Sequence, residues 1–290
     1  MKYSIIIVNY NTSGYVFECI QSIHEQTLND SYEIIVVDNS DELLLSQAAG
    51  TTFQYIKSPG NIGFGRGCNL GADAAIGDIL VFVNPDIKFH ADVLAKLGSE
   101  IARHGPSTII GVNLCDPHGQ PTYSYGHFPG IKNAAAELLC LHKLAPKWFA
   151  SCATALKMPS VTGQTVPVDY VCGALFAVGR ATFSELAGFS KNIFLYFEET
   201  ELLYRHRAGG GAVMLICDQL ASHVGSVSTV DDSDFKILNM EAGRAVYYKT
   251  RYGLGPRLVV KALRVARLIS LAVTKRRFCY VTALKYQLRG

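Results

Sequence analysis

The sequence contains no acidic residue after Glu241, although the whole chain holds 24 aspartates and glutamates. A net charge of only +3 therefore conceals a strongly basic C-terminal end. Such an end indicates an anionic partner surface, either a membrane or a nucleic acid. The positive charges of this stretch are Arg244, Lys249, Arg251, Arg257, Lys261, Arg264, Arg267, Lys275, Arg276, Arg277, Lys285 and Arg289.

Three further absences narrow the class of protein. No run of 18 or more apolar residues occurs, so we expect no transmembrane helix. The 8 cysteines include no Cys-x-x-Cys pair and no zinc-like cluster, which predicts reduced thiols in the core. The N-terminal apolar run, residues 5–8, is too short for a signal peptide. We therefore expect a cytoplasmic protein.

Strand-like and helix-like patterns alternate along the chain, which has 290 residues, 49% of them hydrophobic. Parallel strands joined by helices form right-handed units whose polar strand ends open on one edge. This rhythm predicts an α/β fold with a mostly parallel central sheet flanked by helices. The expected strands are 3–8, 33–38, 53–56, 79–83, 108–112, 169–178 and 212–216, and the expected helices include 15–24, 41–49, 91–104, 132–144, 180–186 and 202–207.

The strand at 79–83 ends abruptly at Asn84-Pro85-Asp86. Proline has no backbone N–H and restricts the residue before it, so a strand ends there. Ligands of open α/β sheets bind outside the carboxyl ends of the strands. Asp86 is therefore a candidate to bind a metal ion, a sugar hydroxyl or a metal-bound phosphate; a simple turn cap is the alternative.

A glycine-rich stretch, residues 60–71, precedes that strand. Its Gly65-x-Gly67-x-x-x-Gly71 pattern is not a dinucleotide fingerprint, because it does not follow the first strand directly. We interpret it as a loop leading into a helix over 69–76 that packs beneath a ligand. A plain connector is the alternative.

Three acids, Glu198, Glu199 and Glu201, follow an aromatic segment at 194–197. Acids in the first turn of a helix interact favourably with the positive end of the helix dipole, which would explain this cluster by helix stability alone. At the rim of a pocket, one of them would instead act as a general base with a pKa raised by burial. His223 is either a core histidine or, with Asp86, part of a site for Mg²⁺ or Mn²⁺ bridging a diphosphate.

Taken together, these motifs resemble family 2 inverting glycosyltransferases of the GT-A fold. The likeness is strongest to the rhamnosyltransferase-like branch of bacterial O-antigen and surface polysaccharide synthesis, and it extends over residues 3–250. The motifs that carry it are Val8-Asn9-Tyr10-Asn11, Val36-Val37-Asp38-Asn39-Ser40, Gly60-Asn61-Ile62-Gly63-Phe64, Asn84-Pro85-Asp86, Gly188-Phe189, Phe194-Leu195-Tyr196-Phe197-Glu198-Glu199 and His223-Val224-Gly225-Ser226.

This resemblance implies a role for each motif. The nucleotide would be held by Asn9, Tyr10, Asn11 and Asp38, with Asp38 meeting the nucleobase. The donor pocket would be lined by Gly63, Phe64 and Asn69. The metal motif would be Asn84-Pro85-Asp86, with His223 joining the metal, and the base would be Glu199.

Two departures from the family pattern bear on these roles. Asn84 replaces the first aspartate of the metal motif, a substitution typical of the rhamnosyltransferase-like branch, which favours a dTDP-L-rhamnose donor. Glu199 is longer than the expected aspartate, so Glu198 and Glu201 stay alternates as the base. A UDP-sugar transferase and a catalytically impaired nucleotide-sugar-binding protein are the competing hypotheses. A sugar-nucleotidyltransferase would carry a basic, glycine-rich phosphate loop where this chain has residues 9–14.

The basic tail, residues 251–290, is expected to follow a GT-A domain with a donor half at 1–115 and an acceptor half at 116–250. One helical face of the tail would carry Arg257, Lys261, Arg264 and Arg267, and another Leu258, Ala262, Val265, Ile269 and Ala272. Such a helix is typical of peripheral binding to an anionic membrane, here the inner face of the cell membrane. The polyprenyl-diphosphate-linked glycan acceptor that the resemblance implies would lie there too. An ordinary solvated helix is the alternative, and no nucleic-acid motif is present.

Overall fold

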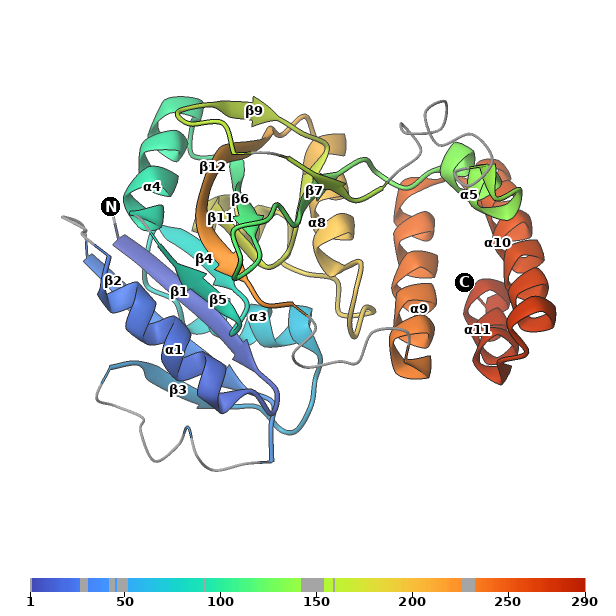
Figure 1. Cartoon of the computed structure of the whole chain (residues 1–290), viewed down its shortest axis with the longest axis horizontal. Helices are drawn as coiled ribbons and strands as arrows, with labels where there is room; N and C mark the ends of the chain where they lie inside the picture. The colour runs from blue at the N-terminus through green and yellow to red at the C-terminus, as the bar shows by residue number, and fades with distance from the viewer. Residues whose placement is uncertain are drawn as a thin grey trace.

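A computed structural model of the chain describes residues 2–26, 31–41, 45, 52–90, 92–141, 154–158, 160–225 and 233–289. Figure 1 shows an α/β body with a group of helices beside it that contains the C-terminus. Most of the helix expected at 41–49 and the end of the one expected at 132–144 lie outside the described residues.

The α/β body is built on a nine-stranded sheet in the described part of the chain, and this confirms the predicted fold class. Its first four strands are all parallel: β3 (Gln54–Lys57), β2 (Ser31–Asp38), β1 (Lys2–Asn9) and β4 (Ile79–Val83). The order then continues through β11 (Leu175–Gly179), β6 (Ile109–Cys115), β12 (Val213–His223) and β5 (Ile87–Phe89), with β9 (Thr165–Pro167) also paired to β12. β11 runs antiparallel between β4 and β6, so the sheet is mixed at its centre.

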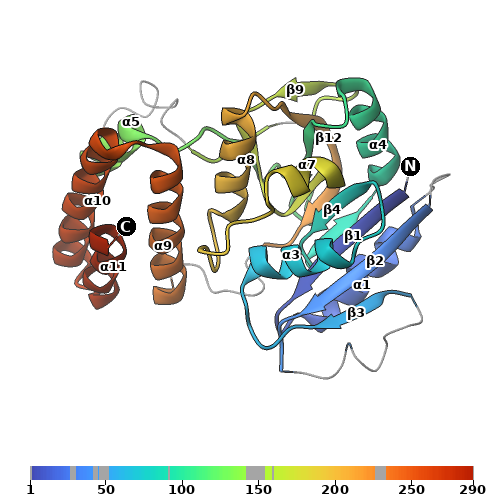
Figure 2. The ribbon, with the colours of Figure 1, turned by 180° about the vertical axis from the view of Figure 1, so that it is seen from behind.

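Helices cover both faces of this sheet, which explains the unbroken apolar runs of its strands. On one face, α1 (Ser13–His24) and α4 (Val93–His104) pack against a core that includes Ile5 and Ile7. On the other, α3 (Phe64–Ala74), α7 (Arg180–Glu185) and α8 (Glu198–Ala208) pack against a core that includes Ile6 and Val8. Figures 1 and 2 show these two helical layers from opposite sides.

The glycine-rich stretch forms helix where the sequence predicted a loop. α3 begins at Phe64, five residues before the expected start at Asn69. A Cβ on Gly67 would lie 2.8 Å from Val8 Cγ1, and one on Gly71 would lie 2.6 Å from Ile6 Cγ2. The glycines are therefore needed for close helix–sheet packing, and the prediction of a loop at Gly65 and Gly67 was wrong.

The strand expected over 169–178 is divided between two sheets. Tyr170–Val171 forms β10, which joins β7 (Tyr123–Gly126) and β8 (Leu156–Lys157) in a three-stranded sheet. The chain then leaves this small sheet at Cys172 and enters the central sheet at Leu175 as β11. The uniform apolar pattern of residues 169–178 gave no indication of this break. Because residues 172–174 lie between the two strands, they can line a cavity.

The helices beside the body are α9 (Asp234–Arg251), α10 (Leu254–Lys275) and α11 (Phe278–Arg289), together with α5 (Ile131–Leu138). Arg264 of α10 is only 3% exposed, because it bonds to Glu137 of α5 and Glu241 of α9. The expectation that Arg264 shares an exposed basic face was therefore wrong. Leu258 and Ile269 of the same helix are 54% and 50% exposed. None of the described helices combines the length and apolarity needed to cross a bilayer.

Candidate active site

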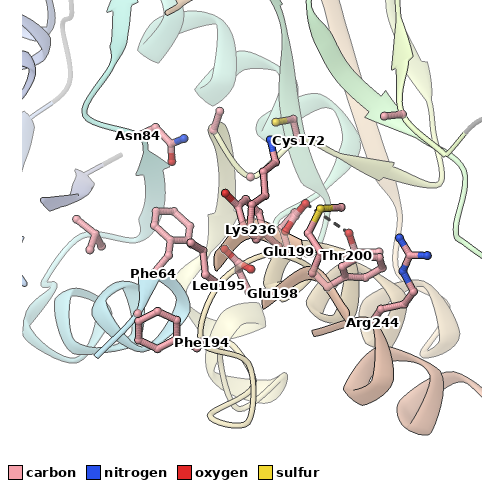
Figure 3. Close-up of a pocket in the computed structure, with 18 of the residues that line it drawn as sticks. Phe64, Asn84, Cys172, Phe194, Leu195, Glu198, Glu199, Thr200, Lys236 and Arg244 are labelled. Atoms are coloured by element: carbon pink, nitrogen blue, oxygen red, sulfur yellow. Dashed lines mark hydrogen bonds between the residues drawn. The ribbon is translucent and has the colours of Figure 1, made fainter. Parts of the chain in front are cut away.

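A cavity of about 480 Å³ lies where strand ends of the central sheet meet the first turn of α8 and one side of α9. β1, β2 and β4 contribute the residues that follow their carboxyl ends, which are Tyr10, Asn39 and Asn84. Figure 3 shows acidic side chains in the middle of the cavity, with residues of different elements around them. The cavity also receives Gly63, Phe64, Asp86, Glu198, Glu199 and His223, all predicted from the sequence.

The predicted nucleotide residues Asn9 and Asp38 are fully buried behind this cavity. Asn9 Nδ2 donates to Asp38 Oδ1 at 2.9 Å, and Tyr55 donates its hydroxyl to Asp38 Oδ2 at 3.0 Å. The first bond joins the end of β1 to the end of β2, the second joins β3 to β2, and Tyr10 and Asn39 directly follow these strand ends. Contact between Asp38 and a nucleobase stays a prediction. Asn11 is exposed, in a left-handed conformation with φ of 55°, and does not line the cavity.

The turn before α3 is joined to the segment that precedes the acids. Phe64 N–H donates to the carbonyl of Phe194 at 3.1 Å. Gly63 has φ of 86°, and a Cβ there would lie 2.1 Å from the same carbonyl oxygen. Asn69 does not line the cavity; its side chain exchanges two hydrogen bonds of 2.9 Å with the backbone of Phe189. Asn69 therefore lies behind the cavity and joins α3 to the backbone of Phe189.

Asp86 and His223 meet at the edge of the cavity. Their Oδ2 and Nε2 atoms are 3.3 Å apart, because β5, which begins at Ile87, pairs with the end of β12. Burial raises the pKa of Asp86, but the hydrogen bond and charge of His223 and the N–H of Gly225 outweigh it, so the pKa is lowered. The Asp86 carboxylate is a usual ligand of both Mg²⁺ and Mn²⁺, whereas the His223 imidazole suits Mn²⁺ better than the harder Mg²⁺. The described residues contain no cluster of three or more potential ligands, so the remaining positions would belong to water and substrate.

Two strained residues place the acids at the cavity. Tyr196 and Phe197 both have left-handed backbones, with φ of 66° and 72°, directly before α8 begins at Glu198. Each such residue costs about 1–3 kcal/mol, which the surrounding packing must offset. α9 supplies part of that packing, since a Cβ on Gly243 would lie 2.2 Å from the Tyr196 carbonyl oxygen. The strained turn is thus held in place by the helices beside the body.

Burial raises the pKa of both Glu198 and Glu199. Glu199 accepts a hydrogen bond of 3.4 Å from Thr200 Oγ1, and backbone N–H groups also stabilise its ionised form. Glu198 Oε2 has no partner among the described residues, and the charge of Glu199 raises its pKa further. Burial and the charge of Glu199 thus both oppose ionisation of Glu198, whereas the hydrogen-bond partners of Glu199 favour its ionised form.

Glu201 does not line the cavity. Arg205 Nε donates to its Oε1 at 2.9 Å, and Thr250 Oγ1 donates to the same oxygen at 3.0 Å. The carboxylate is 3% exposed and joins α8 to α9. The structure thus removes Glu201 as an alternate base, because both its oxygens are held away from the cavity.

Comparison with known proteins identifies the chain. Residues 4–155 match the family model described as Glycosyl transferase family 2. The chain belongs to this family. The matched residues include Tyr10, Asn39 and Asn84, which directly follow β1, β2 and β4, but they do not include the acids of α8.

Curated relatives of this family 2 chain extend the similarity. The low-salt glycan biosynthesis hexosyltransferase Agl10 of Haloferax volcanii is 25% identical over 209 residues, covering 70% of this chain and 61% of the relative. The rhamnosyltransferase WbbL of Escherichia coli is 28% identical over 218 residues, covering 71% of this chain and 77% of the relative. An N-acetylglucosaminyl-diphospho-decaprenol L-rhamnosyltransferase of Mycobacterium tuberculosis is 21% identical, covering 68% of each.

Solved structures confirm the GT-A fold. GalNAc-T7 with UDP, GalNAc and Mn²⁺ superposes with a TM-score of 0.62 at 15% identity, covering 95% of this chain and 57% of that one. The mannosyltransferase PcManGT of Pyrobaculum calidifontis, in complex with GDP-Man and Mn²⁺, gives a TM-score of 0.56 at 14% identity. It covers 99% of this chain and 84% of that one.

Sequence reasoning missed many of the residues that line the cavity of this family 2 chain, including those contributed by α5 and α9. The missed residues are Asn39, Asn61, Pro129, Glu137, Thr154, Ala155, Cys172, Gly173, Phe235, Lys236, Met240 and Arg244. Asn39 and Asn61 lie inside motifs but received no role, whereas Glu137 lies on a helix predicted only as apolar and Arg244 lies where no helix was predicted. Glu137 and Arg244 are brought to the cavity by the contact between α5 and α9. This is a tertiary contact, so no local sequence pattern could have identified the two residues.

Proposed function

We propose that this chain is an inverting glycosyltransferase in which Glu199 is the base. One observation carries the proposal: a single cavity holds the strand-end residues Asn84 and Asp86 together with the buried Glu199. Glu199 takes the proton of an acceptor hydroxyl, whose oxygen attacks the anomeric carbon while the bond to the nucleoside diphosphate breaks. Such a base contributes about 10²–10⁴ in rate.

The proposed donor is dTDP-L-rhamnose. Two relatives are named as rhamnosyltransferases, and Asn84 takes the place of the first metal-motif aspartate. A UDP-sugar is the competing donor, because solved neighbours contain UDP or UDP-GlcNAc. Tyr10, Asn39 and Phe64 line the end of the cavity where the nucleotide is proposed to bind.

A divalent metal fits the residues at the donor end. Asp86 and His223 would hold Mg²⁺ or Mn²⁺, in keeping with the Mn²⁺ in the structures of GalNAc-T7 and PcManGT. Such ions keep several waters and take substrate phosphates as ligands, so two protein groups suffice. The ion would neutralise charge on the departing diphosphate.

The proposed acceptor is a polyprenyl-diphosphate-linked glycan at the inner face of the cell membrane. One relative is named for an N-acetylglucosaminyl-diphospho-decaprenol acceptor. The outer face of α10 supports a membrane location: Leu254, Leu258, Ile269 and Val273 are 66%, 54%, 50% and 71% exposed. These residues recur at helical spacing on a chain end with no acid, which suits an anionic lipid surface.

A donor panel tests this function directly. The full chain is incubated with dTDP-L-rhamnose, UDP-glucose, UDP-N-acetylglucosamine or GDP-mannose, and with a short-chain prenyl diphosphate carrying N-acetylglucosamine. We expect glycosylated product only with dTDP-L-rhamnose. Product from a UDP-sugar alone would overturn the donor assignment. Donor binding without transfer in every reaction would favour a catalytically impaired binding protein.

A further inference from the structure

The two ends of the cavity lie on opposite sides of the acids. Figure 3 shows Asn84 and Phe64 on one side of Glu198 and Glu199, and Arg244 on the other. The side of Asn84 is the strand-end side, where α/β sheets bind their nucleotides. An acceptor hydroxyl must approach the anomeric carbon from the face opposite the leaving diphosphate. The side of Arg244 is therefore where the acceptor has to lie.

Four charged groups from three helices meet at this far side. Arg244 Nη1 of α9 lies 3.2 Å from Glu137 Oε2 of α5 and 3.7 Å from Glu241 Oε1. Arg264 of α10 bonds to both of these carboxylates. Two carboxylates and two guanidinium groups balance in charge, so this network adds no net positive field to the cavity.

Glu137 and Arg244 line the cavity, whereas Glu241 and Arg264 lie behind them. The side chain of Glu137 is 37% exposed, compared with 4% for Arg264. Burial raises the pKa of Glu137, but Arg244 and Arg264 outweigh it and lower the pKa, so this group stays a carboxylate. Both arginines bond its Oε2, and no bond from Oε1 to the described residues is found.

Arg244 offers the complementary donor. Its Nε is buried and has no partner among the described residues, although a buried N–H without a partner is costly. Its guanidinium also lies over the ring of Phe197, 5.3 Å from the ring centroid, in the strained turn before the acids. A hydrogen-bond acceptor and a donor thus stand side by side in the cavity that also holds the proposed base, next to the strained turn that precedes it.

We propose that Glu137 and Arg244 form a subsite for a hydroxyl group of the acceptor's sugar, and that Arg264 is the residue that positions it. This inference rests on the proposed glycosyl transfer. A hydroxyl both donates and accepts, which matches the pair, while the carboxylate of Glu137 would repel the acceptor's diphosphate. The helices beside the body therefore complete the acceptor end of the cavity.

The test compares Glu137→Gln and Arg244→Gln with Lys249→Ala, which removes an exposed cation from the same helix, α9. Initial rates are measured with the prenyl diphosphate carrying N-acetylglucosamine and the donor that the parent uses. Loss of a charged hydrogen bond raises the acceptor KM by on the order of 10-fold or more in both pair variants. We expect the donor KM, the acceptor-independent release of nucleotide and the Lys249→Ala variant to match the parent.

A positioning role for Arg264 predicts a graded effect. Arg264→Lys should raise the acceptor KM less than Arg264→Gln, with the donor KM unchanged in both, whereas a merely structural role would lower the stability and affect both KM values alike. If single variants fail to fold, the double variant Glu137→Gln/Arg264→Gln keeps the charges balanced and removes the carboxylate from the cavity. Thermal unfolding of each variant accompanies the kinetics.

Two results would overturn the inference in distinguishable ways. A parental acceptor KM in Glu137→Gln and in the double variant, with transfer intact, removes the subsite but leaves the proposed function standing. Absence of transfer by the parent with every donor removes the proposed function, and the subsite with it.

Discussion

Gly173 packs directly against Glu199. A Cβ on Gly173 would lie 3.2 Å from both Cβ and Cγ of the glutamate. The break between β10 and β11 therefore brings a residue without a side chain to face the proposed base. The way the chain passes from the small sheet to the central sheet therefore helps to set the position of the proposed base.

Replacing Gly173 with alanine is expected to push Glu199 aside by a few tenths of an ångström and to lower kcat by about 10-fold, because catalysis is sensitive to small misplacements. Steady-state kinetics check this. Gly14→Ala is the matched control, since a Cβ there meets no atom within 4 Å. Unchanged kcat in Gly173→Ala would show that the base tolerates the displacement.

Glu199→Gln is expected to lower kcat by about 10²–10⁴, because the amide cannot take the acceptor proton. Glu198→Gln replaces a carboxyl group whose ionisation is opposed by burial and by the charge of Glu199, so the loss of kcat in this variant should be well under 10². Single-turnover transfer assays separate the two. A larger loss in Glu198→Gln than in Glu199→Gln would exchange their roles.

Activity should fall as the pH is lowered, because the base must be ionised. Burial raises the pKa of Glu199 above its ordinary value of 4.5, so the acid limb of kcat should lie above that pH. The measurement is a kcat–pH profile with saturating substrates. A profile that stays flat down to pH 4.5 would argue against a buried carboxylate as the base.

The buried acids also predict a pH dependence of stability. Because burial raises the folded pKa of Glu198 above 4.5, the folded state holds this proton more tightly than the unfolded state. Its contribution to the free energy of unfolding is complete below the unfolded pKa and declines as the pH rises through the folded pKa. Glu198→Gln cannot ionise, so its Tm should exceed that of the parent increasingly towards alkaline pH. An equal difference at every pH would contradict this account.

Metal removal tests the donor end of the cavity. We expect EDTA to abolish transfer and Mn²⁺ or Mg²⁺ to restore it. Asp86→Asn should weaken the metal-dependent thermal shift with nucleoside diphosphate, since it removes one of the two proposed protein ligands. Differential scanning fluorimetry with and without metal measures this. Full activity in EDTA would mean that the protein alone stabilises the departing diphosphate.

The exposed face of α10 predicts membrane binding by apolar insertion. Leu258→Ser/Ile269→Ser removes two side chains worth about 1.5–3 kcal/mol each when buried, so flotation with anionic liposomes should fall by at least about 10-fold. Phe17→Ser, at a 40% exposed position on α1, is the control on the α/β body. Parental flotation of the α10 variant would remove this face from membrane contact.

The helices of the C-terminal end show where sequence reasoning stopped. Helical spacing divided α10 into a basic face and an apolar face, but the buried side of this helix carries Arg264 together with Val260 and Leu268. The spacing could not decide which face is buried, because the carboxylates that compensate Arg264 come from Glu137 and Glu241, on two other helices. Buried charge is stable only when its partners are present, and those partners meet only after folding.

By itself, the sequence determined the α/β class, the parallel strands and the polar strand ends, because local apolar runs and proline chemistry decide them. The positions after those elements also pointed to Asp86, His223 and the three acids Glu198, Glu199 and Glu201, while the choice of Glu199 among the acids came from the family resemblance. Tertiary structure alone decided that Glu201 is also held by Thr250 of α9, that Gly67 packs against Val8 and that Arg244 faces the cavity. The physical reason is that hydrogen bonds and close packing between distant segments set these positions, and no local pattern encodes them.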